Sequence, residues 1–164
     1  FLIVKFVFFV PIVPTGSMEP TIAEHSALFA LRVHDLEKLE RGDIIVFTAE
    51  TPELAGTTLI KRLIGLPGDH VEIDENGTVT INGEVQQESY VVYQYAIPSE
   101  FDVPEGYYLF MGDNRANSMV TGRTPMFLVS PSRDGRSSPF SRSVILASCS
   151  KAAFITFRNG AMSK

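Results

Sequence analysis

Short runs of apolar, β-branched and aromatic residues, separated by Gly, Pro and Asp, recur along most of the chain. They predict strands over residues 27–33, 43–49, 58–66 and 107–111, and a late strand or strand pair within 144–157. The dipeptides Asn76-Gly77 and Asn82-Gly83 are typical of hairpin turns, whose central residues adopt positive φ. Only residues 35–40 indicate a helical turn. The pattern therefore predicts a mainly β fold.

The chain opens with FLIVKFVFFVPIV, in which 11 of 13 residues are apolar and Lys5 carries the only charge. This run is too short to span a bilayer, which takes about 20 residues. Because the chain starts at Phe1 rather than Met, we interpret residues 1–5 as the end of a truncated membrane anchor. Pro11 disfavours a helix, so we expect a strand within residues 6–13. A buried first strand is the alternative, and both can hold; a secretory signal peptide is less favoured, since no small-residue cleavage site follows.

The composition is that of one folded domain. The 164 residues are 45% hydrophobic and 20% charged, which supplies a core and argues against disorder. The formal charge of −5 argues against a protein that binds nucleic acid through overall positive charge. A single cysteine excludes an internal disulfide and a cysteine-cluster metal site.

The charge is unevenly distributed along the chain. Residues 1–118 carry 7 basic and 18 acidic side chains, a net charge of −11. Residues 119–164 carry 7 basic side chains and a single acid, Asp134, a net charge of +6. This second segment includes the stretch SPSRDGRSSPFSRS, which is typical of a loop. The chain therefore divides near Met119 into two segments of different composition.

Two residues suggest nucleophilic chemistry. Ser17 lies in VPTGSMEPTI, a Pro- and Gly-rich turn that can present a hydroxyl rigidly, although such a serine is usually only a turn residue. A serine nucleophile needs a base, and lysine can serve when burial lowers its pKa. Lys61 lies among apolar residues in TLIKRLIGL, and in a strand it would face inward while Arg62 faced the opposite side. Without further context, Lys61 is more often a solvated residue of an edge strand.

Other candidate groups are less distinctive. His25, His34 and His70 lie in polar, turn-like surroundings without a triad pattern, so we expect surface positions rather than catalytic bases. The segments LERGDIIVF, residues 39–47, and YYLFMGDNRANS, residues 107–118, each combine a Gly-Asp turn with a hydrophobic strand. The second ends in a dense set of hydrogen-bonding side chains, which either organise a site or satisfy one another within a turn.

The motifs PTGSMEPT, RGDIIVF, LIKRLIGLPGD and GDNRANS, in this order, closely resemble the successive conserved motifs of the type I signal peptidases, in the compact form of Gram-positive bacteria. The resemblance covers about residues 6–118, which we interpret as the catalytic domain. It implies an antiparallel, barrel-like β fold and a membrane-bound serine endopeptidase. Such an enzyme removes signal peptides from exported preproteins through a Ser-Lys dyad and needs no metal or organic cofactor.

The resemblance implies roles for the matching residues. Ser17 corresponds to the nucleophile and Lys61 to the general base. The Ser17 N–H and the Thr15 hydroxyl correspond to the oxyanion hole. Ser118 corresponds to a serine that orients the lysine amine, and Arg62 and Asp113 to a supporting ion pair.

Met18 corresponds to a residue that shapes the substrate pocket and the membrane-facing rim. We expect this rim and the aromatic residues Phe6, Phe8 and Phe9 to contact lipid, with burial of these aromatics in the core as the alternative. The expected partners are the lipid bilayer and preproteins with small residues before the cleavage site, and no nucleic acid. The expected location is the bacterial cell membrane, in a single pass with the catalytic domain on the extracytoplasmic side.

The resemblance ends after Ser118. Where the family has an aspartate and its paired arginine, this chain has Val120 and Gly122, and Arg123 stands one place late. Residues 119–164 are either a divergent native ending or the product of a shifted reading frame, and the abrupt change in charge favours the latter. In that case the second ion pair and the last strands of the domain would be absent.

Two other functions stay open. A related Ser-Lys peptidase of conjugative pilin maturation or of repressor self-cleavage would use the same dyad on a related β fold. The apolar start argues against the soluble repressors, and the Lys-Arg pair ahead of LPGD fits the signal peptidases better than either. The alternative without enzyme activity is an inactive, membrane-associated relative, suggested by Val120 and the altered C-terminal segment.

Overall fold

The secondary structure is almost entirely β in the computed structural model, which describes residues 8–32, 38–48, 57–95, 97–117, 126–129 and 145–147. The strands are β1 (Phe8–Phe9), β2 (Ala30–Arg32), β3 (Ile44–Thr48), β4 (Thr58–Gly65), β5 (His70–Ile73), β6 (Val79–Ile81), β7 (Glu84–Val85), β8 (Ser99–Asp102), β9 (Tyr107–Met111), β10 (Met126–Val129) and β11 (Ile145–Ala147). The described residues also include two short 3-10 turns, η1 (Gly16–Met18) and η3 (Arg115–Asn117).

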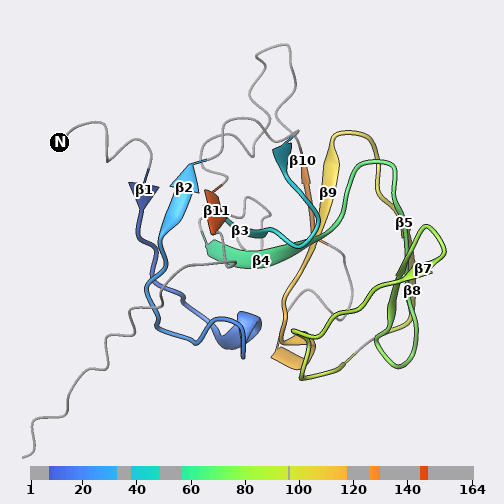
Figure 1. Ribbon diagram of the computed structural model, residues 1–164, viewed down its shortest axis with the longest axis horizontal. Coiled ribbons are helices and arrows are strands. Elements are labelled where there is room, and N and C mark those ends of the chain that lie inside the picture. The colour runs from blue at the N-terminus through green and yellow to red at the C-terminus, as the bar shows by residue number, and fades with distance from the viewer. Residues whose placement is uncertain are drawn as a thin grey trace, which may run out of the picture.

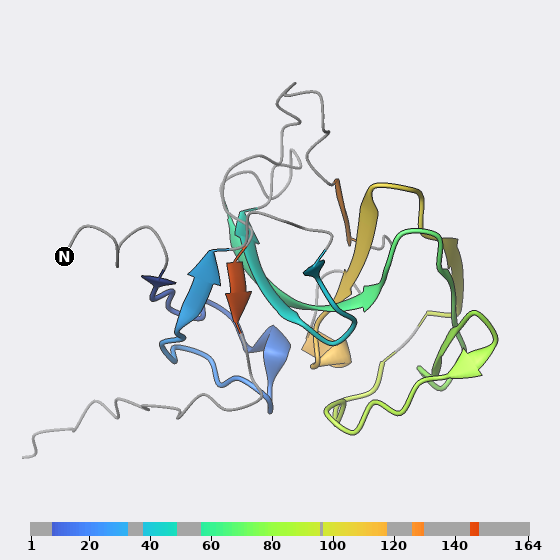
Figure 2. The same cartoon turned by 45° about the horizontal axis from the view of Figure 1, so that its top comes forward.

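The strands form two sheets whose pairings are all antiparallel. The larger sheet has the order β1-β2-β11-β3-β4-β9-β10, and the smaller one the order β7-β6-β5-β8. Figure 1 shows the small sheet at the opposite end of the molecule from β1 and β2, and Figure 2 shows how strongly β3 and β4 curve. The predicted antiparallel β fold is therefore confirmed.

The predicted hairpin turn at Asn82-Gly83 is also confirmed. These two residues join β6 to β7 with φ values of 52° and 82°, the left-handed conformation that an Asn-Gly pair adopts readily. The turn at Asn76-Gly77 lies between β5 and β6, where Asp74 Oδ1 accepts hydrogen bonds from the backbone N–H groups of Asn76 and Thr78.

β4 is an interior strand of the larger sheet and carries Lys61 and Arg62. It pairs with β3 on one side and β9 on the other, and its residues from Ile60 onward are buried. At its end the register with β9 shifts between Leu63 and Gly65. A Cβ on Gly65 would lie 2.9 Å from a methyl of Val103, so only glycine allows the two sheets to approach this closely.

Buried apolar side chains form three clusters around β4. One joins Ile60 to η1, β2 and β3, and one joins Leu63 to Phe47 and Phe110. The third joins Ile64 to Val71 and other residues of the small sheet. The core is therefore continuous from the N-terminal strands to the small sheet through one strand.

The ends of the chain are described in part. The predicted anchor, residues 1–5, lies outside the described residues, as do residues 35–37 of the helical turn predicted at 35–40 and most of 119–164. No helix among the described residues is long and apolar enough to cross a membrane. β11 confirms a strand within 144–157; it lies between β2 and β3, and β10 pairs with β9. Whether this segment is a native ending stays a prediction.

Candidate active site

Ser17 lies in the tight turn η1, which follows β1 and the isolated bridge at Ile12 along the chain. The turn is closed by a 3.2 Å hydrogen bond from the Glu19 N–H to the Gly16 carbonyl. The carboxylate of Glu19 folds back over this turn, 3.0 Å from where a Cβ on Gly16 would lie. Met18 and Ile22 are fully buried and fix the turn to the core. The Ser17 hydroxyl is therefore held on a well-packed support.

Lys61 of β4 reaches Ser17 from the other side of the site. Its Nζ lies 2.7 Å from Ser17 Oγ, in a hydrogen bond between groups that are 3% and 5% exposed. The Thr15 hydroxyl donates a 3.2 Å hydrogen bond to the same oxygen. The structure thus brings together Thr15, Ser17 and Lys61, as the motifs predicted.

Burial changes the acidity of the lysine. Removal of the Lys61 ammonium from water lowers its pKa from 10.5 to about 8, and the negative charge of Asp113 partly opposes this shift. At pH 7 such a lysine is neutral in about a tenth of the molecules, against about 0.03% for an ordinary lysine. Lys61 can therefore accept the Ser17 proton near neutral pH.

Arg62, the next residue of β4, forms the predicted ion pair with Asp113. The guanidinium binds the carboxylate with two parallel hydrogen bonds, Nε to Oδ1 at 2.8 Å and Nη2 to Oδ2 at 2.6 Å. Its third nitrogen, Nη1, donates to the Gly42 carbonyl at 2.8 Å. The side chains are 10% and 1% exposed, so each charge depends on the other for compensation.

Asn114 connects this pair to the nucleophile, a role that sequence reasoning missed. Its backbone N–H donates to the Ser17 carbonyl at 3.0 Å, and its Nδ2 donates to the Gly16 carbonyl at 3.2 Å. The loop after β9 therefore holds η1 in place, and Figure 1 shows η1 and η3 side by side at the same end of the larger sheet. The polar stretch GDNRANS was the signal that pointed to this loop.

The segment between β7 and β8 adds contacts that no motif indicated. The ring of Tyr90 lies over the guanidinium of Arg62, 4.0 Å from carbon to centroid. The Tyr90 hydroxyl donates to Glu88 at 2.7 Å, and Arg115 donates to the same carboxylate oxygen at 2.7 Å. The charged pair beside Lys61 is thus covered by a different part of the chain.

The chain is similar to known proteins over most of its length. Residues 1–120 match the profile of the family described as "Signal peptidase, peptidase S26". The chain belongs to this family.

Curated relatives carry the same designation. A "Probable signal peptidase I-2" of Synechocystis sp. is 38% identical over 114 residues, covering 65% of this chain and 50% of that protein. A "Signal peptidase I" of Bacillus amyloliquefaciens is 36% identical over 130 residues, 72% of this chain and 65% of that protein. The crystal structure of a signal peptidase I from Enterococcus faecalis V583 is 34% identical, with a TM-score of 0.47, covering 56% of this chain and 90% of that chain. The chain therefore spans about half to two thirds of the length of these curated relatives.

One expectation for this member of the signal peptidase family was wrong. Met18 is fully buried in the cluster with Val13 and Ile60, because η1 turns its side chain into the core. It cannot form a membrane-facing rim. The side chains of Phe6, Phe8 and Phe9 lie outside the described residues, as does Ser118, whose lysine-orienting role stays a prediction.

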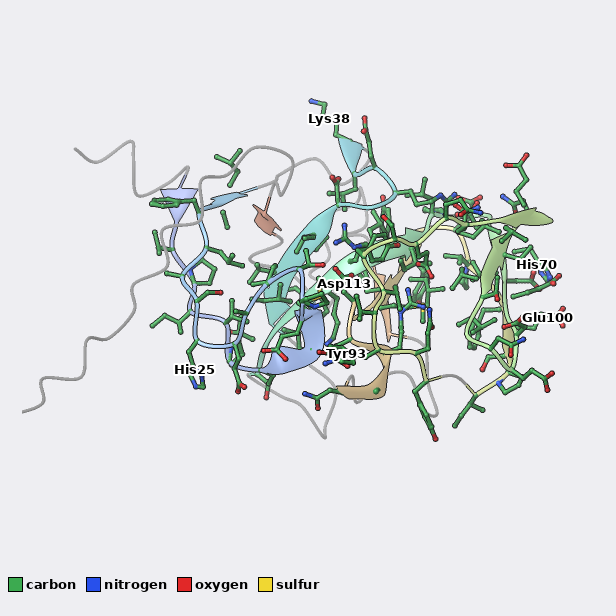
Figure 3. All side chains as sticks on the ribbon, turned by 60° about the horizontal axis from the view of Figure 1, so that its bottom comes forward. His25, Lys38, His70, Tyr93, Glu100 and Asp113 are labelled. Carbon is green, nitrogen blue, oxygen red and sulfur yellow. The ribbon has the colours of Figure 1, made fainter. Side chains whose placement is uncertain are left out.

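The histidines that are described lie away from the site. His25 is exposed, and His70 lies on the small sheet among Glu72, Glu100 and Asp102. Figure 3 shows His25 and His70 well to either side of Asp113. His34 lies outside the described residues. Among the side chains that the structure describes, no group of three or more His, Cys, Asp or Glu residues is arranged to hold a metal ion.

Proposed function

We propose that this protein is a membrane-bound serine endopeptidase that removes signal peptides from exported preproteins through a Ser17-Lys61 dyad. The observation that carries the proposal is the 2.7 Å contact between Lys61 Nζ and Ser17 Oγ in a buried site. An isolated buried ammonium is unfavourable, so its retention beside a hydroxyl calls for a chemical role. Membership of the signal peptidase family supports the same reaction.

The first half of the reaction acylates Ser17. Neutral Lys61 takes the proton of the Ser17 hydroxyl while Oγ attacks the scissile carbonyl carbon. The resulting oxyanion accepts hydrogen bonds from the Ser17 N–H and from Thr15 Oγ1, which rotates from its contact with Ser17. The C–N bond then breaks, and the Lys61 ammonium gives its proton to the leaving amine.

The second half releases the signal peptide. Neutral Lys61 takes a proton from a water molecule, whose oxygen attacks the ester carbonyl of the acyl-enzyme. The C–Oγ bond breaks, and the proton returns to Ser17. Ser118 would orient the Lys61 amine in both halves of the reaction. The Arg62–Asp113 pair would hold β4 against the loop after β9.

Met18 would shape the substrate pocket from below rather than at its rim. It is buried beside Ile60, which directly precedes Lys61. Because the Met18 side chain would leave the pocket shallow, it would accept small substrate side chains before the cleavage site. The catalytic domain would comprise residues 6–118, and residues 119–164 would be an atypical basic segment.

An exposed apolar face supports a membrane location. Val10 and Ile12 are exposed and alternate with buried Pro11 and Val13. Phe29, just before β2, and Leu31, within β2, are also exposed. Because Phe8 pairs with Leu31, these two residues lie on the same face of the sheet as Val10 and Ile12. Such a face suits lipid contact. The protein would lie in the bacterial cell membrane in a single pass, with this domain on the extracytoplasmic side.

Cleavage of a preprotein by the detergent-solubilised protein tests the proposal. Ser17→Ala and Lys61→Ala are each expected to abolish cleavage after small residues, while Ser26→Ala, in a turn outside the site, retains it. A circular dichroism spectrum confirms that each variant folds. Self-cleavage of the chain alone would instead indicate a repressor-like peptidase, cleavage of pilins alone a pilin-maturing one, and no cleavage by the wild-type protein an inactive relative.

Flotation with phospholipid vesicles tests the membrane face. Ile12→Asp and Phe29→Asp are expected to weaken vesicle binding, because each places a charge on the apolar face. Val85→Asp, at an exposed position of the small sheet, is the matched control and leaves binding unchanged. Equal binding by all three variants would contradict this role of the face.

A further inference from the structure

The segment between β7 and β8 engages both arginines of the charged network beside Lys61. The aromatic ring of Tyr90 lies over Arg62, and the Tyr90 hydroxyl donates to Glu88 Oε1. The same Glu88 oxygen accepts a hydrogen bond from Arg115 Nη2. Glu88 and Arg115 are 9% and 1% exposed, so this arrangement is built into the interior rather than laid on the surface.

The network reaches the nucleophile in a few steps. Arg62 follows Lys61 on β4 and binds Asp113 with two hydrogen bonds. The next residue, Asn114, holds the backbone of Gly16 and Ser17. A displacement of Arg62 therefore acts on both partners of the dyad, on Lys61 along the strand and on Ser17 through the loop.

Tyr90 is suited to fix Arg62 in place. A guanidinium is attracted to the face of an aromatic ring, and this attraction is stronger where water is excluded. The ring also covers the Arg62 side of the ion pair, and its partial burial raises the pKa of the Tyr90 phenol. The Tyr90 hydroxyl lies in the plane of the ring and donates to Glu88, so the contact with Arg62 is made by the ring face.

We propose that Tyr90 is a positioning residue of the Ser17-Lys61 site, holding Arg62 on Asp113 and keeping water from the pair. This inference rests on the proposed function but goes beyond it, because no catalytic motif includes the β7–β8 segment. Tyr90 acts through Arg62 and has no contact with the reacting atoms.

The consequence for Lys61 has a definite sign. The charged groups near the lysine are Asp113, whose negative charge favours the ammonium, and Arg62, which compensates that charge. Loss of the Tyr90 ring would weaken the contact of Arg62 with Asp113, so the negative charge of Asp113 would act more strongly on Lys61. It would also admit water to the site, and both effects favour the charged form of Lys61. The pKa of Lys61 would rise, so less of the enzyme would hold a neutral base at neutral pH.

The pH dependence of kcat/KM for preprotein cleavage tests this step. Tyr90→Leu is expected to raise the midpoint of the acidic limb by about half a pH unit to one pH unit. The rate at pH 7 would then fall roughly threefold to tenfold, while the rate near pH 10 would stay unchanged. Tyr90→Phe keeps the ring and should retain the wild-type profile. Tyr95→Leu, an exposed tyrosine on the same segment, is the matched control. A uniform loss at all pH values in Tyr90→Leu would indicate a merely structural role and overturn the proposal.

A measurement without catalysis separates this inference from the proposed function. The lysine Cε resonances of ¹³C-lysine-labelled protein are titrated by NMR, and the signal that disappears in Lys61→Met identifies Lys61. The midpoint should rise in Tyr90→Leu and stay unchanged in Tyr90→Phe, whether or not a preprotein is cleaved. Equal midpoints in wild-type and Tyr90→Leu protein would refute the role of Tyr90 and leave the proposed function intact. Tyr90→Met, whose longer and more flexible side chain can adapt to the space of the ring, replaces the leucine variant if that variant unfolds.

Discussion

Lys61 Nζ and Ser17 Oγ lie 2.7 Å apart, although 44 residues separate them in sequence. The contact forms because the turn η1 and the strand β4 share one buried cluster, in which Met18 packs with Ile60. The backbone directly beside each functional group is thus fixed by apolar packing. The site is a product of the core and does not depend on a flexible loop.

The activity should depend on the ionisation of Lys61. Since only the neutral amine accepts the Ser17 proton, kcat/KM is expected to rise about tenfold per unit at acidic pH and to level off near pH 8. A stopped assay of preprotein cleavage between pH 5 and 10 measures this profile. A limb centred near 6.5 would instead point to a histidine as the base.

Replacement of the lysine should stabilise the protein while it destroys the activity. The folded-state pKa of Lys61 lies near 8, below its unfolded value of 10.5, so the folded state carries a penalised ammonium below pH 8. Lys61→Met removes that penalty and is expected to raise the free energy of unfolding at pH 7 by up to about 3 kcal/mol. Urea denaturation at pH 7 and at pH 10.5 measures the gain, which should shrink at the higher pH. A destabilised variant at pH 7 would show that the ammonium is well compensated in the fold.

Loss of the Asp113 charge should affect both the fold and the base. Asp113→Asn leaves Arg62 buried without its carboxylate, which is expected to cost about 3–5 kcal/mol of unfolding free energy. The pKa of Lys61 should fall, because the negative charge that favours the ammonium is gone. Chemical denaturation measures the first effect and the NMR titration of Lys61 the second. An unchanged Lys61 midpoint in folded Asp113→Asn protein would argue against electrostatic coupling of the two residues.

Asn114 should matter for the position of the nucleophile. Asn114→Ala removes two side-chain hydrogen bonds, the one that Nδ2 donates to the Gly16 carbonyl and the one that Oδ1 accepts from the Asn117 N–H, and leaves the backbone bond to Ser17 in place. We expect kcat to fall roughly tenfold to a hundredfold with little change in KM, since small displacements of a reacting group are costly. Asn117→Ala, an exposed position of the same loop, is the control. Steady-state kinetics measures kcat and KM of both variants. An equal loss of kcat in both would assign the effect to the loop as a whole.

Local patterns predicted the elements whose conformation is decided locally. The strand over residues 107–111 was predicted at its observed bounds, because its residues are apolar and mostly aromatic and Gly106 and Gly112 flank them. The turn at Asn82-Gly83 followed from the preference of these two residues for positive φ. The predicted start of the strand at residue 27 was early, since Ala27 forms only an isolated bridge to Ile12.

Contacts between residues far apart in sequence were predicted only where family motifs indicated which residues act together. Ser17, Lys61, Arg62 and Asp113 were found together because the order of their motifs resembled one family. Tyr90 was not found, since a ring stacked on an arginine 28 residues away leaves no pattern in the sequence. Met18 was placed at a membrane-facing rim because it matches a family position, whereas it lies in the 3-10 turn η1 and is fully buried.

The alternation of exposed and buried residues along the first strands has a mechanical consequence. The exposed residues Ile12 and Phe29 face outward, while Val13 and Leu28 on the reverse side pack with Met18, the neighbour of Ser17. A surface that binds the outward face would therefore fix the distance between that surface and Ser17. The domain would measure a constant number of substrate residues from the bilayer to the scissile bond.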